Sequence, residues 1–484
     1  MLWPKEPAIL ELNAWTWLDS LARRHGRAFG LGDVPAEEWD RLVAPGFDGL
    51  WLMGVWERSP ASQAIASTHE GLLGEYRKAL TDFALQDVVG SPYAVHRYVV
   101  DERLGGDEGL AVARRKLSQR GVLLLLDFVP NHVAVDHPWV TERPDLFLSC
   151  PEGGEGFFPS AGRFLAHGKD PNFPAWTDTA QLHLMKKETR TAMAEVLCSI
   201  ADRCDGVRCD MAMLPMVQVF QRTWGELAAG DTPTRFWPDI IGKVRSHRPG
   251  FLFMGEVYWD LEGELLAQGF DLAYDKRLRD RLLHSDGPAV REHVEGAAGI
   301  GGMLVRFLEN HDEQRAASAF ALPRLKAAAV AASTLPGSLL IQEGQARGAR
   351  IRLPVQLGRR PVESPDAEVS RFYDFLFRET LRGPFRKGQW ELCPTTGWPD
   401  NQSHRRLLCW ARAQEHVRTL VVVNLAPYSS QARVLLPWAD LAHRSWRLFD
   451  VGKGVVYERN GSEMINPGLF VDLEPWGYHM LSWQ

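Results

Sequence analysis

The amino-acid sequence predicts an α/β protein whose largest part is a closed (β/α)8 TIM barrel. Three observations lead to this prediction: short apolar runs that end in polar residues, helical patterns between the runs, and the eightfold recurrence of this pair. Strands buried on both faces of a parallel sheet are typically continuous apolar runs, and eight strand–helix units are typical of a barrel. The expected strands are 9–12, 49–53, 122–128, 206–209, 251–255, 271–274, 304–308 and 338–341.

Helical patterns fill the intervals between these strands, and the clearest are 108–119, 187–201, 238–246 and 324–333. One interval departs from this alternation. Residues 133–182 are rich in Pro, Gly, Asp and aromatic side chains and show little periodicity, which is typical of a functional insertion. We therefore expect a short inserted domain B at 133–182, after the third strand, and a barrel formed by residues 1–132 and 183–385.

The pattern changes again after residue 385. Short β-rich segments divided by turn signals follow one another here, which is typical of an antiparallel β-sandwich. The segments are 407–411, 419–424, 432–436 and 445–449. We expect a separate C-terminal β-sandwich domain at 386–484.

Composition restricts the class of protein. The chain has 484 residues, 45% of them hydrophobic and 24% charged, which is typical of a water-soluble globular protein. A net charge of −6 argues against a nucleic-acid partner. No apolar run is long enough to cross a bilayer, no signal peptide is recognisable, and the six cysteines lack metal-binding spacing. We expect a cytoplasmic protein without a membrane partner, whose oligomeric state the sequence does not specify.

Four polar clusters follow predicted strands three, four, five and seven. They are 127–132, 208–210, Glu256 and 309–313. The carboxyl ends of barrel strands meet at one mouth, where the active sites of such barrels lie. We therefore expect several carboxylates, one arginine and two histidines to line a single cleft.

This set of side chains suits glycoside hydrolysis with retention of configuration, in which one carboxylate attacks the sugar and a carboxylic acid protonates the leaving oxygen. Arg208 is two residues from Asp210 and should keep it ionised as the nucleophile. Negative neighbours should raise the pKa of Glu256 and keep it protonated. The imidazoles of His132 and His311 can hydrogen-bond sugar hydroxyls.

Each cluster also has a purely structural interpretation. An Asp or Asn before an irregular segment is often a helix cap, and Arg-x-Asp is often a surface ion pair. Glu256 alone could be a solvated strand end, and 310–312 could be a loop held by local hydrogen bonds. The order of all four clusters along the predicted barrel favours the catalytic interpretation.

At this level the chain resembles the α-amylase family, glycoside hydrolase family 13. The resemblance extends over nearly the whole chain and rests on short segments that are similar to the family's signatures. These segments are 46–52 (GFDGLWL), 91–95 (SPYAV), 127–132 (DFVPNH), 176–178 (WTD), 206–210 (GVRCD), 254–257 (MGEV) and 307–312 (FLENHD).

The resemblance implies a role for each matching side chain. Asp210 would be the nucleophile, Glu256 the acid/base, and Asp312 the residue that grips sugar hydroxyls and stabilises the transition state. Tyr93 would stack under the glucose that is cleaved. The same site would be lined by His132, Arg208 and His311.

Two departures from the family pattern bear on specificity and on metal binding. Many amylases that act on polysaccharides carry Lys-His shortly after the nucleophile, whereas here the stretch 211–214 is Met-Ala-Met-Leu, so the leaving-group side is expected to be apolar. Asn131 matches a calcium ligand of many amylases, and Asp136, Asp170 and Asp178 are candidate partners. The chemistry requires no cofactor, and a structural calcium at Asn131 and Asp178 is an open expectation.

The sequence thus predicts a retaining hydrolase of α-glucosidic bonds, with malto-oligosaccharides or short α-glucosides as its carbohydrate partners. Two alternatives stay open. A transglycosylase or disaccharide isomerase would use the same catalytic residues, and a non-catalytic glycan-binding scaffold would share the fold. The scaffold is the less favoured alternative, because the chain keeps all three catalytic carboxyls.

Overall fold

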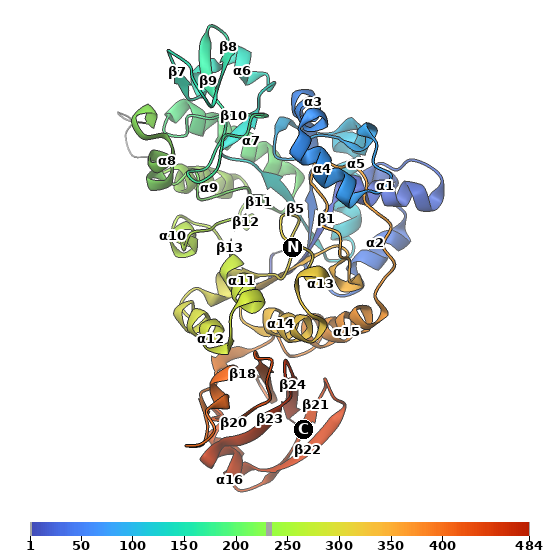
Figure 1. Ribbon diagram of the computed structural model, residues 1–484, viewed down its shortest axis with the longest axis vertical. Coiled ribbons are helices and arrows are strands. Elements are labelled where there is room, and N and C mark those ends of the chain that lie inside the picture. Colours follow the sequence, from blue (N-terminus) through green and yellow to red (C-terminus); the bar gives the residue numbers. More distant parts are fainter. Residues whose placement is uncertain (1, 229–234, 484) are drawn as a thin grey trace.

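The computed structural model describes residues 2–228 and 235–483. Eight parallel strands close into a barrel in the order β1-β15-β14-β13-β12-β11-β5-β2, which confirms the predicted fold class (Figure 1). Every predicted barrel strand is present within two residues of its expected bounds. The strands are β1 (Ala8–Asn13), β2 (Gly49–Met53), β5 (Leu123–Phe128), β11 (Gly206–Cys209), β12 (Leu252–Gly255), β13 (Leu272–Tyr274), β14 (Leu304–Arg306) and β15 (Ser338–Gln342).

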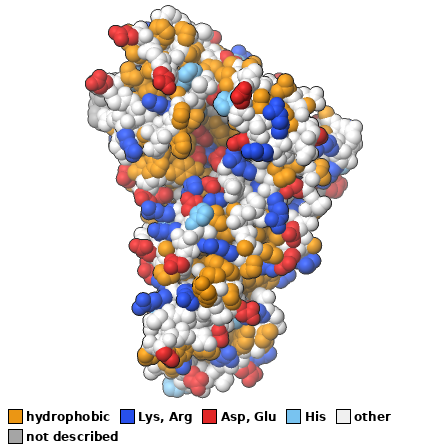
Figure 2. All heavy atoms as spheres, viewed as in Figure 1, with side chains coloured by type: hydrophobic (Ala, Val, Ile, Leu, Met, Phe, Trp, Pro, Cys, Tyr) orange, Lys and Arg blue, Asp and Glu red, His pale blue; other side chains and the backbone are white. Residues whose placement is uncertain are grey.

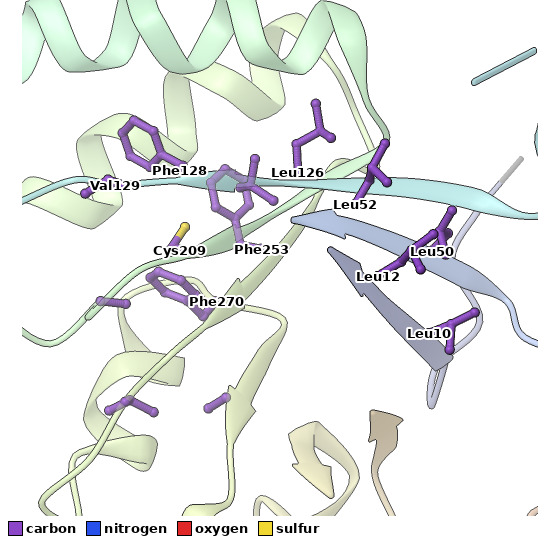
Figure 3. Packing of buried hydrophobic residues seen from close by; sticks show 14 of the residues in the cluster. Leu10, Leu12, Leu50, Leu52, Leu126, Phe128, Val129, Cys209, Phe253 and Phe270 are labelled. Atoms are coloured by element: carbon purple, nitrogen blue, oxygen red, sulfur yellow. The ribbon is translucent and has the colours of Figure 1, made fainter. Parts of the chain in front are cut away.

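Side chains that alternate along these strands form two separate apolar layers. One set fills the barrel interior and includes Ile9, Trp51 and Leu125. The other set points outward against the helices, as Leu10 and Leu50 do in Figure 3. Burial on both faces explains why the strands read as continuous apolar runs in the sequence.

Helices surround the barrel, and helical patterns were predicted at α5, α7, α9 and α14. The first helix begins at a side-chain cap, because Asn13 Oδ1 accepts from the backbone N–H groups of Trp15 and Thr16. The helices are α1 (Ala14–His25), α2 (Ala36–Val43), α5 (Gly106–Ser118), α7 (Lys187–Arg203), α8 (Val217–Trp224), α9 (Phe236–His247), α10 (Glu262–Ala267), α11 (Lys276–His284), α12 (Gly287–Gly296), α13 (Ala316–Ala319), α14 (Leu322–Thr334) and α15 (Ala367–Phe377).

Two excursions lie at the carboxyl end of the barrel strands. The first follows β2 and was not predicted; it contains β3 (Trp56–Arg58), α3 (Pro60–Thr68), α4 (Glu70–Ala79) and β4 (Val95–Val100). The second occupies the predicted insertion after β5 and contains two small sheets, β10-β6 and β7-β9-β8. Its elements are β6 (His132–Ala134), α6 (Trp139–Glu142), β7 (Ser149–Cys150), β8 (Phe157–Ser160), β9 (Arg163–Ala166) and β10 (Thr179–Gln181).

A long irregular segment, residues 348–366, leads from the end of β15 to α15, and we call it the strap. Its backbone pairs with the first excursion, since Val88 and Leu357 form an isolated antiparallel bridge. Arg359 fastens it further by bonding both carboxylate oxygens of Asp87. Irregular segments of this length are usually functional.

The C-terminal part is an antiparallel sandwich of a six-stranded and a three-stranded sheet. It packs below the barrel, on the side of α14 in Figure 1. Its elements are β16 (Gln389–Leu392), β17 (Thr395–Thr396), β18 (Leu407–Gln414), β19 (Val417–Asn424), β20 (Ser430–Val434), β21 (Ser445–Asp450), β22 (Val455–Asn460), α16 (Gly461–Glu463), β23 (Leu469–Leu473) and β24 (Tyr478–Trp483). The exact domain boundaries stay a prediction. Among the described residues, no helix is both long and apolar enough to cross a bilayer.

Candidate active site

Arg208, on β11, joins the two carboxyl groups that the sequence singles out for catalysis. Its Nη1 lies 2.7 Å from Asp210 Oδ1, and its Nη2 lies 2.6 Å from Glu256 Oε2. The guanidinium is completely buried, and Nη1 also lies 3.7 Å from Asp127 Oδ1. Residues from the ends of β5, β11 and β12 therefore meet around one cation. Figure 2 shows the surface hollowed over the barrel, with acidic side chains inside the hollow.

The acid Glu256 is fixed by further contacts at the end of β12. Its backbone N–H donates to the Cys209 carbonyl, and its Oε2 accepts from the backbone N–H of Met211 at 2.8 Å. The Tyr258 hydroxyl donates to Oε1 at 2.6 Å. Both oxygens are thus held in place, one beside Arg208 and the other beside a phenol.

The electrostatics of this pair differ in part from the sequence prediction. Burial is the main factor that raises the pKa of Glu256, and the charges of Asp210 and Asp312 add to it while Arg208 opposes it. Burial also raises the pKa of Asp210, and the ion pair with Arg208 opposes this without reversing it. Arg208 was expected to keep Asp210 ionised, and it does favour the charged form, but burial outweighs it and the pKa of Asp210 is raised. Two carboxyls that share one guanidinium titrate as a pair.

A second chain of polar contacts begins inside β1. Glu11 Oε1 lies 2.7 Å from His311 Nδ1, and the His311 Nε2 lies 2.8 Å from the Tyr93 hydroxyl and 3.0 Å from Asp312 Oδ2. Asp312 and Glu11 outweigh burial and raise the pKa of His311 well above its usual range. Although burial opposes ionisation of Asp312, His311 lowers its pKa to about 2. The Asp312 side chain is 48% exposed and keeps a charged carboxylate at the mouth.

Aromatic rings form the floor around these groups. Tyr93 stacks on His311 with ring centroids 5.4 Å apart, and Trp51 meets the same imidazole edge-on at 5.5 Å. The Arg208 guanidinium carbon lies 5.1 Å from the Tyr93 ring centroid and 5.2 Å from that of Trp51. Tyr93 is thus part of the site, as predicted from its segment.

His132 is buried beside the site, and it packs on Trp176 of the insertion with ring centroids 5.1 Å apart. Burial lowers the pKa of His132 to about 4, so its imidazole is neutral at pH 7. A neutral imidazole offers one donor and one acceptor nitrogen. His132 can therefore hydrogen-bond a sugar hydroxyl without adding charge.

The candidate calcium residues do not meet at one point. Asn131 Oδ1 accepts from Gln181 Nε2 at 3.0 Å, and Asn131 Nδ2 donates to Gln181 Oε1 at 3.1 Å, so the two amides satisfy each other. Asp178 instead accepts from the Ser62 hydroxyl at 2.7 Å. No group of three or more His, Cys, Asp or Glu within the described ranges is arranged to hold a metal. Asn131 and Asp178 thus do not fit a shared calcium, and the metal requirement stays a prediction.

The apolar stretch after the nucleophile lies mostly outside the site. Ala212, Met213 and Leu214 belong to the apolar core between the barrel and its helices. Only Met211 is partly exposed, in a left-handed backbone conformation with φ of 40°. Of the four residues expected to make the leaving-group side apolar, Met211 alone is therefore exposed enough to contribute.

Two residues that contact the site, Glu11 and Tyr258, were missed from the sequence. Glu11 is an isolated acid within the apolar first strand, which is itself a recognisable signal. Tyr258 and Trp259 follow Glu256 in a loop whose tertiary course the sequence does not reveal. Trp259 has φ of 64°, and its side chain is 38% exposed. Strained backbone of this kind clusters at functional sites.

Known proteins resemble this chain in sequence and in fold. No family model matches the chain. The α-amylase MalA of Haloarcula japonica is 26% identical over 356 residues, which are 70% of this chain and 49% of that protein. The chain is therefore similar in sequence to an α-amylase. It spans about half the length of this curated relative.

Solved α-amylase structures share the fold over whole chains. The α-amylase of Lactobacillus plantarum superposes with a TM-score of 0.71 and 17% identity, covering 99% of both chains. The α-amylase of Geobacillus thermoleovorans, complexed with acarbose, gives a TM-score of 0.69 and 17% identity, covering 99% of this chain and 98% of that one. The fold of this chain, with its barrel, insertion and C-terminal sandwich, is therefore shared with these α-amylases.

Proposed function

We propose that the protein is a retaining glycoside hydrolase that cleaves α-glucosidic bonds of malto-oligosaccharides or short α-glucosides. The observation that carries the proposal is the buried guanidinium of Arg208, which hydrogen-bonds both Asp210 and Glu256. Their contact with one guanidinium supports the proposal that both carboxyls act on a single glycosidic bond. Retaining enzymes need a separation of about 5–5.5 Å between these groups.

In the first step, an oxygen of Asp210 attacks the anomeric carbon of the bound glucose. The bond from that carbon to the leaving oxygen breaks, its electron pair stays on the oxygen, and the oxygen takes the proton of Glu256. Arg208 then faces the carboxylate left on Glu256, which stabilises the charge that develops there. Asp312 and His132 would hydrogen-bond the sugar hydroxyls during this step.

In the second step, Glu256 acts as a base. It takes a proton from water, the water oxygen bonds to the anomeric carbon, and the ester bond to Asp210 breaks. The carboxylate of Asp210 and the acid form of Glu256 are restored, so two inversions give net retention. The His311 cation, held by Glu11, keeps Asp312 ionised throughout.

The test is product analysis by chromatography on a panel of maltose, maltotriose, starch, pullulan, isomaltose, trehalose and sucrose. Release of glucose and maltose from maltotriose, absent in Asp210→Asn and normal in the exposed control Asp400→Asn, supports the proposal. Longer oligosaccharides from maltotriose would instead identify a transglycosylase. Equal turnover by Asp210→Asn would refute the catalytic assignment.

A further inference from the structure

A second cavity, of about 500 Å³, lies on the flank of the barrel. Its inner end is lined by Glu11 and His311, and it extends past Ile341 to Phe47, before β2, and Phe377, at the end of α15. The catalytic carboxyls do not line it. Its volume lies within the range of small-molecule sites. The cavity therefore shares one wall with the active site and is otherwise separate from it.

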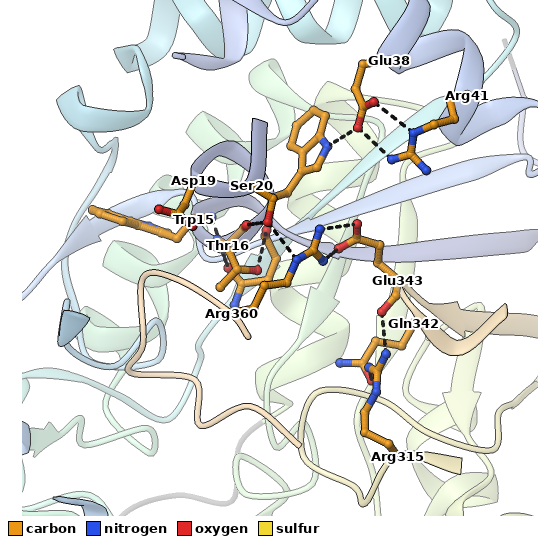
Figure 4. A network of polar contacts seen from close by, with 12 residues as sticks. Trp15, Thr16, Asp19, Ser20, Glu38, Arg41, Arg315, Gln342, Glu343 and Arg360 are labelled. Carbon is orange, nitrogen blue, oxygen red and sulfur yellow. Dashed lines mark hydrogen bonds and ion pairs between the residues drawn. The ribbon is translucent and has the colours of Figure 1, made fainter. Parts of the chain in front are cut away.

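Arginines crowd the wall of this flank cavity between α1, α2 and the strap. Arg24 and Arg41 are half-exposed and share one acid, since each contacts Glu38 Oε1. Arg360 binds both carboxylate oxygens of Glu343 (Figure 4). Three guanidinium groups thus face two carboxylates, which leaves one positive charge in excess.

Arg347 adds a further charge to the same cavity. It is exposed, and no acidic partner contacts it among residues 2–228 and 235–483. Glu363 also lines the cavity, but its carboxylate accepts from the backbone N–H groups of Arg350 and Ile351 and offsets one of these charges. Arg24, Arg41, Arg347 and Arg360 thus exceed Glu38, Glu343 and Glu363 by one positive charge at this part of the wall, which favours an anion.

The inner end of the cavity is lined by buried polar atoms that lack hydrogen-bond partners among the described residues. Glu11 is 1% exposed and Arg315 is 6% exposed, yet within the part of the chain that the structure describes Glu11 Oε2 and Arg315 Nε have no hydrogen-bond partner. Buried polar atoms are normally paired, so each calls for a partner. Glu11 Oε2 needs a donor and Arg315 Nε needs an acceptor. A hydroxyl group can supply either.

We propose that the flank cavity binds a phosphorylated monosaccharide as an effector. The sugar hydroxyls would pair with Glu11 and Arg315 at the inner end, and the phosphate would lie against Arg24 and Arg347. Apolar side chains such as Ile341 line the cavity between the two ends and suit the carbon faces of a sugar ring.

Occupancy would reach the active site through Glu11. This carboxylate holds His311 through Oε1, and His311 contacts both Asp312 and Tyr93. A ligand hydroxyl on Glu11 Oε2 would weaken its hold on His311 and thereby alter the grip of Asp312 on substrate. The effector is therefore expected to change the KM for an α-glucoside, a readout that rests on the proposed function.

Calorimetric titration of the full-length Asp210→Asn variant tests binding without turnover. We expect saturable binding of glucose 6-phosphate, at least tenfold tighter than binding of glucose or inorganic phosphate. Arg24→Gln combined with Arg347→Gln should weaken it at least tenfold, whereas the surface control Arg222→Gln should not. If glucose 6-phosphate does not bind, or if the double variant binds it equally well, the proposal is wrong. If inorganic phosphate binds as tightly as glucose 6-phosphate, the sugar part of the ligand contributes nothing and that part of the proposal is wrong.

A second titration separates this site from the active site. Binding of glucose 6-phosphate should persist in the presence of saturating maltotriose. Displacement by maltotriose would place the ligand in the catalytic cleft and overturn the flank site. Because both titrations use an inactive variant, failure of the catalytic assignment would instead be seen as activity retained by Asp210→Asn.

Discussion

The Nη2 atom of Arg208 lies 2.6 Å from Oε2 of Glu256, so the cation that contacts the candidate nucleophile also holds the candidate acid. Burial favours the neutral form of both carboxyls, and Arg208 opposes burial at each of them. One guanidinium between two carboxyls favours a state with a single shared negative charge. This is the state that the first chemical step requires, with one ionised nucleophile and one protonated acid.

Replacing Arg208 with an uncharged residue should lower both the free energy of unfolding and kcat. In Arg208→Met, the carboxyls of Asp210 and Glu256 lose their buried partner. Breaking a buried ion pair from one side costs about 3–5 kcal/mol, and we expect kcat to fall by about 10³ or more, since charge stabilisation in the transition state is lost. Urea denaturation and initial rates measure the two effects. Activity within tenfold of the wild-type value would contradict this role, and Arg222→Met is the matched control.

The phenol of Tyr258 should tune the acid. Its hydrogen bond to Glu256 Oε1 lowers the pKa of Glu256 against the effect of burial. Tyr258→Phe removes the bond, so the pKa of Glu256 should rise and the basic limb of the kcat/KM profile should move to higher pH by up to about one unit. A purely structural role for Tyr258 would lower activity at every pH and leave the limb unmoved.

The paired amides of Asn131 and Gln181 should make the fold independent of calcium. Each amide supplies the other's missing hydrogen bond. Dialysis against EDTA should leave the melting temperature unchanged, whereas Gln181→Ala should destabilise the protein by about 1–3 kcal/mol, because a buried amide is left unpaired. A melting temperature that falls in EDTA and recovers with Ca²⁺ would contradict this expectation.

Because of Glu38, the free energy of unfolding is expected to depend on pH. Burial opposes its ionisation, but hydrogen bonds from Arg41 and Trp17 outweigh burial and lower its pKa to about 2. A lowered pKa stabilises the fold above the unfolded-state value near 4.5, and this contribution is lost as the pH falls toward 2. Since Arg24 and Arg41 are half-exposed, Glu38→Gln should cost about 1–2 kcal/mol at pH 7. Urea titrations of both proteins should converge near pH 2; a constant difference would refute the effect.

The barrel could be predicted because its strands follow a local rule. Burial on both faces makes each strand an apolar run, and the polar groups at its carboxyl end, such as Asp210 after β11, follow directly in the sequence. The same rule located Glu256 and Asp312. It could even have located Glu11, whose charge is out of place within an apolar strand.

Other parts depend on contacts between distant segments and leave no local pattern. The excursion that carries α3 and α4, and the strap at 348–366, are held by pairs such as Asp87 and Arg359. The burial of Met213 and Leu214, and the hydrogen bond from Tyr258 to Glu256, likewise depend on tertiary packing. An apolar stretch in the sequence does not show whether it lines a cleft or fills a core.

Covalent trapping tests the central claim most directly, namely that Asp210 forms the glycosyl–enzyme bond. Protein treated with 5-fluoroglucosyl fluoride, which forms the intermediate faster than it resolves, is digested and its peptides are weighed by mass spectrometry. We predict that one fluoroglucosyl group is attached to the peptide that contains Asp210, and that Asp210→Asn carries none. Attachment to another residue, or equal labelling of Asp210→Asn, would contradict the account.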